Sequence, residues 1–174
     1  MRSAETMQNR VWRAYQEHRR GLFALAYAIT GTRDVAEDAV HDGVVAVVRG
    51  TGTPRNPKAY LYRAVRNEAL RAARASAARG GIAIDAVGES LIAPSADRPD
   101  RRALAGEEAA ALRDALLAIR ADEREVIVLR IHAGLKFREI ADLLGVPLPT
   151  AASRYQRGIT HMAKELKEIA DVAE

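Results

Sequence analysis

Residues 135–157, LKFREIADLLGVPLPTAASRYQR, restrict the fold of this chain more than any other stretch. The first half carries apolar residues at helical spacing: Ile140, Leu143 and Leu144. Gly145 then supplies the positive φ that commonly ends a helix, and the prolines at positions 147 and 149 prevent that helix from resuming. A second helix is expected to begin at about Pro149 or Thr150. Two helices joined by such a turn form a helix-turn-helix, whose second helix enters the major groove of DNA.

The second predicted helix separates its side chains by face. An apolar stripe follows alternating steps of four and three residues: Tyr155, Ile159, Met162, Leu166 and Ile169. A basic stripe lies on another face: Arg154, Arg157, His161 and Lys164. At about 100° per residue, Tyr155 and Arg157 lie about 200° apart, so one stripe can be buried while the other faces a phosphate backbone. A basic face that is merely exposed to solvent would explain the same stripe. The turn before the helix favours DNA binding instead, because it completes a helix-turn-helix.

Composition predicts further helices and no sheet. Of the 174 residues, 48% are apolar, much of this fraction is alanine, and aromatic residues make up 5%. The net charge is +4, and residues 1–75 contain 13 Lys and Arg against 7 Asp and Glu, whereas residues 103–174 contain 10 against 12. The basic excess therefore lies away from the helix-turn-helix, and it is compatible with a polyanionic partner without requiring one.

Several function classes find no support in the sequence. There is no cysteine, the four histidines have no metal-ligand spacing, and no phosphate loop or nucleophile motif occurs, so we expect no enzyme, metal or cofactor. The N-terminus is charged rather than apolar, and no apolar run approaches the roughly 20 residues of a membrane span. The expectation is a soluble intracellular protein without membrane insertion.

Three helices are predicted before the middle of the chain, over residues 11–29, 34–48 and 58–74, with Gly31 ending the first and Thr32 or Asp34 capping the second. The second is acidic at three positions: Glu37, Asp38 and Asp42. The last two are four residues apart and project from one side, which by spacing alone is typical of a solvated face.

The third predicted helix follows a loop rich in Gly and Pro at residues 49–57. Leu61, Val65, Ala69 and Ala72 share one side of the helix, and a basic arc with Tyr60 inside it takes the other: Arg63, Arg66, Asn67, Arg71 and Arg74. Cations beside an aromatic ring suit single-stranded nucleic acid, because they track phosphates while the ring stacks on a base. An ordinary surface helix with extended arginines is the alternative.

Residues 76–103 have no sustained period and are predicted to be a linker, with a short apolar island at 82–87. Helical periodicity resumes over residues 104–119, and Asp122 can cap a following helix that ends before Gly134. With the helix-turn-helix, residues 104–174 form a four-helix C-terminal domain, and residues 1–75 form an N-terminal one. The predicted fold class is all-α, as two small helical domains joined by a linker.

Three blocks of the sequence, in this order, resemble the extracytoplasmic-function (ECF) sigma factors of bacterial RNA polymerase, in the sigma-70 family. RRGLFALAYAITGTRDVAEDAVHD resembles the family's first conserved region, and NPKAYLYRAVRNEALR resembles its promoter-melting helix. EREVIVLRIHAGLKFREIADLLGVPLPTAASRYQRG resembles its C-terminal domain. The resemblance implies a sigma factor that binds core RNA polymerase and directs transcription from promoters with -10 and -35 elements.

The resemblance also assigns residues. The acidic helix, with Glu37, Asp38 and Asp42, would dock on the polymerase, which reverses the interpretation of a solvated face. The -10 element would be held as single strand by Arg55, Asn56, Tyr60, Arg63, Arg66, Asn67 and Arg71. The -35 element would be contacted as duplex by Lys136, Thr150, Ser153, Arg154 and Arg157. The linker would follow the polymerase toward the RNA exit path, and the free protein is expected to be a monomer that an anti-sigma factor can bind.

The sequence departs from the family pattern in three places. Pro149 to Arg154 replaces the usual Gly-Thr-Val-Lys-Ser-Arg start, so a lysine is missing. The loop at 49–57 has no aromatic residue, and Val47 or Val48 stands where Trp is common. These departures predict altered or weaker DNA contacts at both elements.

Two other functions are considered. A helix-turn-helix regulator that acts without polymerase explains residues 120–167 but leaves the acidic and arginine-rich helices unexplained, and it predicts a dimer on a palindrome. A sigma-like interaction protein with weakened DNA reading is suggested by the alanines at 151 and 152.

Overall fold

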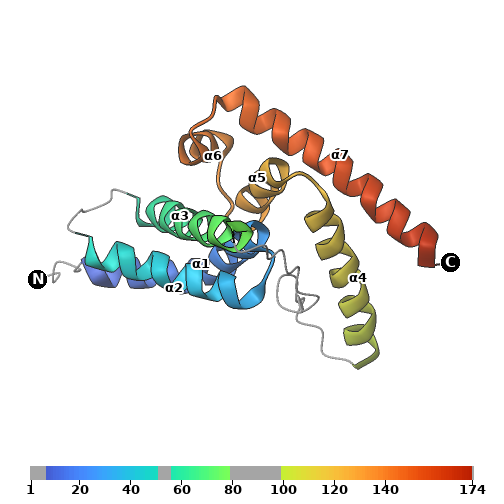
Figure 1. Ribbon diagram of the computed structural model, residues 1–174, viewed down its shortest axis with the longest axis horizontal. Coiled ribbons are helices and arrows are strands. Elements are labelled where there is room, and N and C mark those ends of the chain that lie inside the picture. The colour runs from blue at the N-terminus through green and yellow to red at the C-terminus, as the bar shows by residue number, and fades with distance from the viewer. Residues whose placement is uncertain (1–6, 51–55, 79–98, 174) are drawn as a thin grey trace, which may run out of the picture.

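The computed structural model describes residues 7–50, 56–78 and 99–173. This part of the chain folds into seven α-helices and no strand, which confirms the all-α prediction (Figure 1). The helices are α1 Met7–Thr30, α2 Arg33–Arg49, α3 Pro57–Ala78, α4 Pro99–Ala118, α5 Ala121–Ile131, α6 Phe137–Leu144 and α7 Leu148–Ala173. We call α1–α3 the N-terminal helical group and α4–α7 the C-terminal helical group.

The N-terminal helical group is a three-helix bundle in which each helix packs against the other two. Leu22, Leu25, Leu61 and Val65 are fully buried between them. Gly31, at φ 74°, ends α1 as predicted. Gly43 allows α2 to approach α3 closely, because a Cβ built there would lie 2.8 Å from the backbone of Val65.

The C-terminal helical group is built around α5, whose residues 126–129 are almost completely buried. Gly145 ends α6 at φ 68° as predicted, and α7 begins at Leu148, slightly before the predicted start. The apolar stripe expected to bury α7 is only partly correct, since Ile159 remains 39% exposed. Gly158 lets α7 approach α5, because a Cβ built there would lie 2.8 Å from the Ile127 side chain, and the small Ala151 is fully buried.

Helix boundaries correct two sequence expectations. Asp122 does not cap α5, because Arg120 occupies the N-cap position and Asp122 lies in the first turn. Thr32 occupies the N-cap position of α2 but makes no capping hydrogen bond through its side chain. Helix also extends into both ends of the predicted linker, since α3 runs to Ala78 and α4 begins at Pro99. Residues 79–98, with the apolar island at 82–87, lie outside the described residues.

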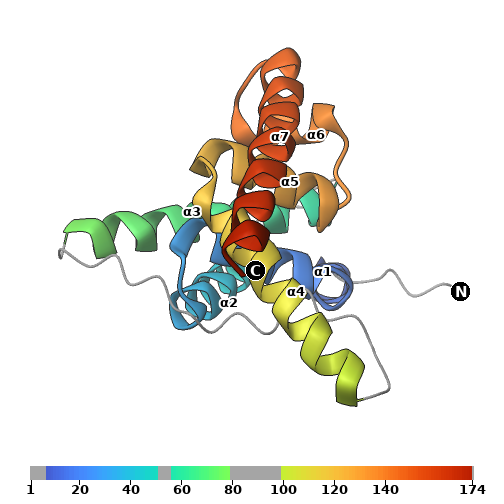
Figure 2. The same cartoon turned by 90° about the vertical axis from the view of Figure 1, so that its right-hand side faces the viewer.

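The two helical groups pack against each other, which the sequence did not predict. Helix α5 lies between α7 and the N-terminal helical group and contacts α1, while α6 contacts α3 (Figures 1 and 2). Gly21 of α1 lies at this junction, because a Cβ built there would meet the Tyr62 hydroxyl at 2.2 Å and the His132 carbonyl oxygen at 3.0 Å. The buried apolar side chains of both groups form one continuous cluster.

Candidate nucleic-acid interface

The three predicted docking carboxylates, Glu37, Asp38 and Asp42, are all exposed on α2. Glu37 accepts a hydrogen bond of 2.9 Å from Arg33 one turn earlier, and Asp42 lies 3.6 Å from Arg71 of α3. The opposite face of α2 is buried against α1 and α3. Exposed ion pairs of this kind are weak, so the carboxylates remain available to a cationic partner surface.

The start of α3 gives Asn56 a structural role. Its side-chain oxygen accepts a hydrogen bond of 3.1 Å from the backbone N–H of Ala59, which caps the helix, and Pro57 takes the first helical position that proline favours. Tyr60 follows on the exposed side, 41% accessible. Arg55 lies outside the described residues. The Tyr60 ring is therefore exposed in the first turn of α3, as stacking on a base requires.

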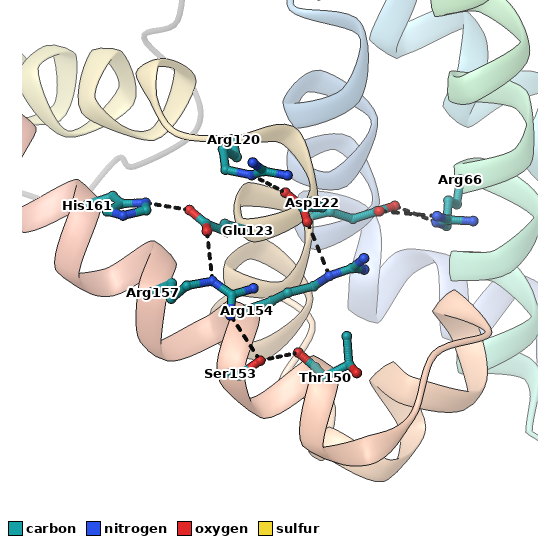
Figure 3. A network of polar contacts seen from close by, with 10 residues as sticks. Arg66, Arg120, Asp122, Glu123, Thr150, Ser153, Arg154, Arg157 and His161 are labelled. Atoms are coloured by element: carbon teal, nitrogen blue, oxygen red, sulfur yellow. Dashed lines mark hydrogen bonds and ion pairs between the residues drawn. The ribbon is translucent and has the colours of Figure 1, made fainter.

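Two arginines of the basic arc on α3 are in contact with the C-terminal helical group. The Arg66 guanidinium donates to both carboxylate oxygens of Glu125 on α5, at 2.5 and 3.2 Å (Figure 3). One turn earlier, Arg63 donates to the backbone carbonyl of Asp142 on α6, at 3.2 Å. The Arg66 and Glu125 side chains are 21% and 11% exposed, so their pair is largely shielded from water.

The other two members of the basic arc proposed to contact DNA, Asn67 and Arg71, lie on the exposed side of α3. Arg71 donates to Glu68 one turn earlier at 2.7 Å, in addition to its contact with Asp42. Its side chain is 71% exposed, so the guanidinium remains accessible to solvent. Among these residues of the basic arc, Arg66 is thus the one that the C-terminal helical group largely shields, whereas Arg63 is held by that group but stays exposed.

The predicted basic stripe of α7 faces α5 as well as solvent. The Glu123 carboxylate, 1% exposed, accepts from Arg157 Nε at 3.3 Å and lies 2.7 Å from His161 Nδ1 (Figure 3). Arg157 also donates to Ser153 Oγ at 3.3 Å, and Ser153 donates to the Thr150 carbonyl at 3.2 Å. The side chain of Arg157 is nevertheless 53% exposed, so it is held by a buried carboxylate while its outer face is open.

Arg154 is held in a similar way by Asp122, also in the first turn of α5. Its Nε lies 3.3 Å from the Asp122 carboxylate, which also accepts from Arg120 at 3.2 Å (Figure 3). Burial of the Asp122 carboxyl favours its neutral form, but the hydrogen bond from Arg120 and the charge of Arg154 outweigh this and lower its pKa. Asp122 therefore stays ionised and keeps Arg154 in place near the start of α7.

Lys136, the remaining predicted -35 residue, lies just before α6 and is exposed. Its backbone N–H donates to the Glu139 carboxylate at 2.8 Å, which fixes the first turn of that helix. The five predicted -35 residues therefore come from the position just before α6 and from the first three turns of α7.

Sequence reasoning missed the three acids that hold the arginines: Asp122, Glu123 and Glu125. Their common signal is the stretch ADERE at residues 121–125, which places acidic side chains in the first turn of α5. Carboxylates are favoured there by the helix dipole, so the pattern alone indicates a helix start and not an ion-pair centre.

Other kinds of site are not found in the described part of the chain. None of the described residues forms a group of three or more His, Asp or Glu side chains suited to a metal ion. Within the same residues, no helix combines the length and the apolar character that crossing a bilayer needs.

Two family models match the chain. The model described as "Sigma-70 region 2" matches residues 14–79, and the model described as "Sigma-70, region 4" matches residues 109–162. Together they cover more than half of the chain. The first match begins in α1 and spans α2 and α3, and the second begins in α4 and includes α5, α6 and the first part of α7.

Two curated relatives that align with most of this chain are named as ECF RNA polymerase sigma factors. The ECF RNA polymerase sigma factor SigE of Mycolicibacterium smegmatis is 29% identical over 166 residues, 91% of this chain and 63% of its own length. The chain thus spans less than two thirds of that relative. The ECF RNA polymerase sigma factor SigM of Mycobacterium tuberculosis is 29% identical over 155 residues, 87% of this chain and 74% of its own length.

Two solved structures share the fold. The sigma factor RpoE of Bartonella quintana, solved in complex with the anti-sigma factor NepR, superposes with a TM-score of 0.66 at 23% identity, over 90% of this chain and 96% of that one. The extracytoplasmic-function sigma factor SigJ of Mycobacterium tuberculosis superposes with a TM-score of 0.53 at 24% identity, over 87% of this chain and 53% of that one. At these identities the likeness concerns the fold.

Proposed function

Because the chain belongs to the sigma-70 family, in its extracytoplasmic-function group, we propose that it binds core RNA polymerase and directs transcription initiation from promoters with -10 and -35 elements. The observation that carries this proposal is the pair of family matches in the family's order, one on each helical group. A regulator that acts without polymerase is not favoured, because it would leave the match over residues 14–79 without a role.

Docking on the polymerase is assigned to the acidic face of α2. Glu37, Asp38 and Asp42 are exposed on the side of α2 that faces away from the bundle, so a basic surface can approach them without rearrangement of the core. Their existing ion pairs are exposed and exchange readily for intermolecular ones.

Reading of the -10 element is assigned to α3 and the residues before it. Tyr60 offers an exposed ring for stacking, and Arg63 and Arg71 offer exposed guanidinium groups for phosphates and base edges. Arg66 adds a third guanidinium when its contact with Glu125 is displaced. Asn67 lies on the same exposed side. Contacts from Arg55 and from the capping side chain of Asn56 stay predictions.

Reading of the -35 element is assigned to the start of α7, with Lys136 beside it. Thr150, Ser153, Arg154 and Arg157 occupy the first three turns of the helix, where the second helix of a helix-turn-helix contacts base edges. The buried Glu123 and the ionised Asp122 orient the two arginines, which reduces the conformational entropy lost on binding. The polymerase would hold both helical groups near DNA and raise their effective concentration.

The remaining assignments follow from this activity. We propose that the chain acts as a non-catalytic subunit, in the cytoplasm where transcription takes place, and that it is a monomer before it binds polymerase. The solved relative from Bartonella quintana was captured with an anti-sigma factor, and we propose that an anti-sigma factor also binds this chain.

The docking proposal is tested by reversing charge on α2. Asp38→Arg combined with Asp42→Arg should abolish capture of core polymerase in a pull-down or by interferometry, while circular dichroism shows an unchanged helical fold. The matched control is Glu168→Arg combined with Asp171→Arg, which makes the same charge change on exposed positions of α7 and should leave core affinity unchanged. Equal core affinity of the α2 variant and the parent would remove the docking assignment.

A further inference from the structure

Arg66 is placed to make two contacts that exclude each other. In the structure its guanidinium is bound by the Glu125 carboxylate, and in the proposed function the same guanidinium binds the -10 strand. We propose that the Arg66–Glu125 pair is an autoinhibitory latch, by which the C-terminal helical group covers the -10 reading face of α3 in the free chain. This proposal rests on the proposed function, because it concerns the regulation of the same DNA-binding face.

The geometry of the latch resembles arginine bound to phosphate. Glu125 presents two oxygens to the Nε and one terminal nitrogen of Arg66, at 2.5 and 3.2 Å, which is the paired arrangement that guanidinium also adopts with phosphate. Both side chains are mostly shielded from water. A DNA phosphate that takes up the same paired arrangement on Arg66 must therefore displace the carboxylate.

Two further contacts close the same junction. Arg63, another proposed -10 residue, donates to the Asp142 carbonyl of α6 at 3.2 Å, so a second, solvent-exposed contact ties the neighbouring turn of α3 to the C-terminal helical group. At the other side of the junction, Gly21 permits Tyr62 and the His132 carbonyl to approach α1. These contacts join parts of the chain that are far apart in sequence, since Arg66 and Glu125 are separated by 59 positions.

Opening of the latch breaks no helix. Every contact that closes the junction lies between the N-terminal and C-terminal helical groups, and residues 79–98 connect the groups along the chain. Asn67 and Arg71, two exposed members of the basic arc, stay available in the closed form and can make the first contact with DNA. Completion of the -10 contact then requires separation of α3 from α5 and α6.

The test replaces Glu125 by its neutral isostere in the full chain. Glu125→Gln should bind a fluorescein-labelled single-stranded oligothymidylate about tenfold more tightly than the parent in fluorescence anisotropy, since weakening the closed form raises the competent fraction. Glu168→Gln, which removes the same charge from an exposed position of the C-terminal helical group, is the control and should change affinity less than twofold. Equal gains in both variants would show a nonspecific charge effect and overturn the latch.

A distance measurement tests opening without DNA. Because the chain has no cysteine, cysteines introduced at the exposed Ala46 of α2 and Ala163 of α7 are unique labelling sites for energy transfer. Glu125→Gln should lower the transfer efficiency. Gly21→Ala changes no charge and places a methyl group against Tyr62 and His132. It should also lower the transfer efficiency, and it provides the test if Glu125→Gln does not fold.

Two failures can be told apart. Unchanged transfer in both variants would overturn the latch, while core-dependent transcription by the parent would still support the proposed function. Failure of the proposed function would instead appear as an inability of the parent, and of both opened variants, to bind core polymerase.

Discussion

Substitution of Gly43 by alanine tests the close approach of α2 and α3, on which the positions of the docking and -10 residues depend. A Cβ at this position would lie 2.8 Å from the backbone N and Cα of Val65 and from its Cγ2 atom, about 1 Å inside ordinary contact distance. Because two of these atoms belong to a helix backbone, α3 must shift as a unit.

The expected size of the effect follows from two opposing contributions. Overpacking of this kind costs about 1–3 kcal/mol, whereas Gly to Ala within a helix gains about 1 kcal/mol of helix propensity. We expect Gly43→Ala to lower the free energy of unfolding by up to about 2 kcal/mol, which corresponds to a fall in Tm of up to about 8 °C for a chain of this length. Chemical and thermal denaturation followed by circular dichroism measure both quantities.

The control is Ala46→Gly, at an exposed position one turn later on α2. It should lose about 1 kcal/mol through helix propensity alone. If Gly43→Ala instead raises the free energy of unfolding by about 1 kcal/mol, its effect is helix propensity alone, equal and opposite to that of the control. That result would refute the close packing of α2 on α3.

Two further predictions concern promoter reading and pH. Arg154→Ala with Arg157→Ala should lower transcription mainly from promoters with an intact -35 element. The control, Lys164→Ala with Lys167→Ala, removes the same charge further along α7 and should not lower transcription. If the arginine variant lost as much transcription on templates without a -35 element, the assignment would be contradicted. Burial, with the nearby charge of Lys58, lowers the pKa of His18 in the folded chain. Below about pH 6.5 the unfolded chain therefore binds a proton at this histidine more readily than the folded chain does. The free energy of unfolding should therefore fall as the pH drops through about 6.5, and it should fall less steeply in His18→Asn. Urea titrations at several pH values measure this free energy, and an equal pH dependence in parent and variant would argue against the effect.

Local signals account for the parts of the fold that the sequence predicted. Gly31 and Gly145 each end a helix with positive φ, and the hydrophobic spacing around them placed the helices to within a few residues except at the ends of the linker stretch. The face by which α7 packs was predicted less well, because a hydrophobic stripe emphasises large side chains such as Ile159. Where α7 crosses α5 closely, the small residue Gly158 decides how near the two helices approach.

Long-range contacts account for what the sequence did not predict. The basic arc on α3 was identified from its spacing, but the partner of Arg66 is separated from it by 59 positions and lies on another helical group. Glu123 was missed for the same reason, since a helix-start pattern does not reveal that Arg157 and His161 of α7 will close over it. A helical wheel gives the direction of a side chain, whereas only the packing of α5 between the N-terminal helical group and α7 gives its partner.

Reconstitution with core polymerase tests the central claim most directly. The purified chain is combined with bacterial core RNA polymerase, and transcripts from a genomic DNA library are mapped at their 5′ ends. The account predicts discrete start sites that require this chain and share two upstream elements at -10 and -35 spacing. Start sites that do not depend on the chain, or its failure to associate with core polymerase, would contradict the account.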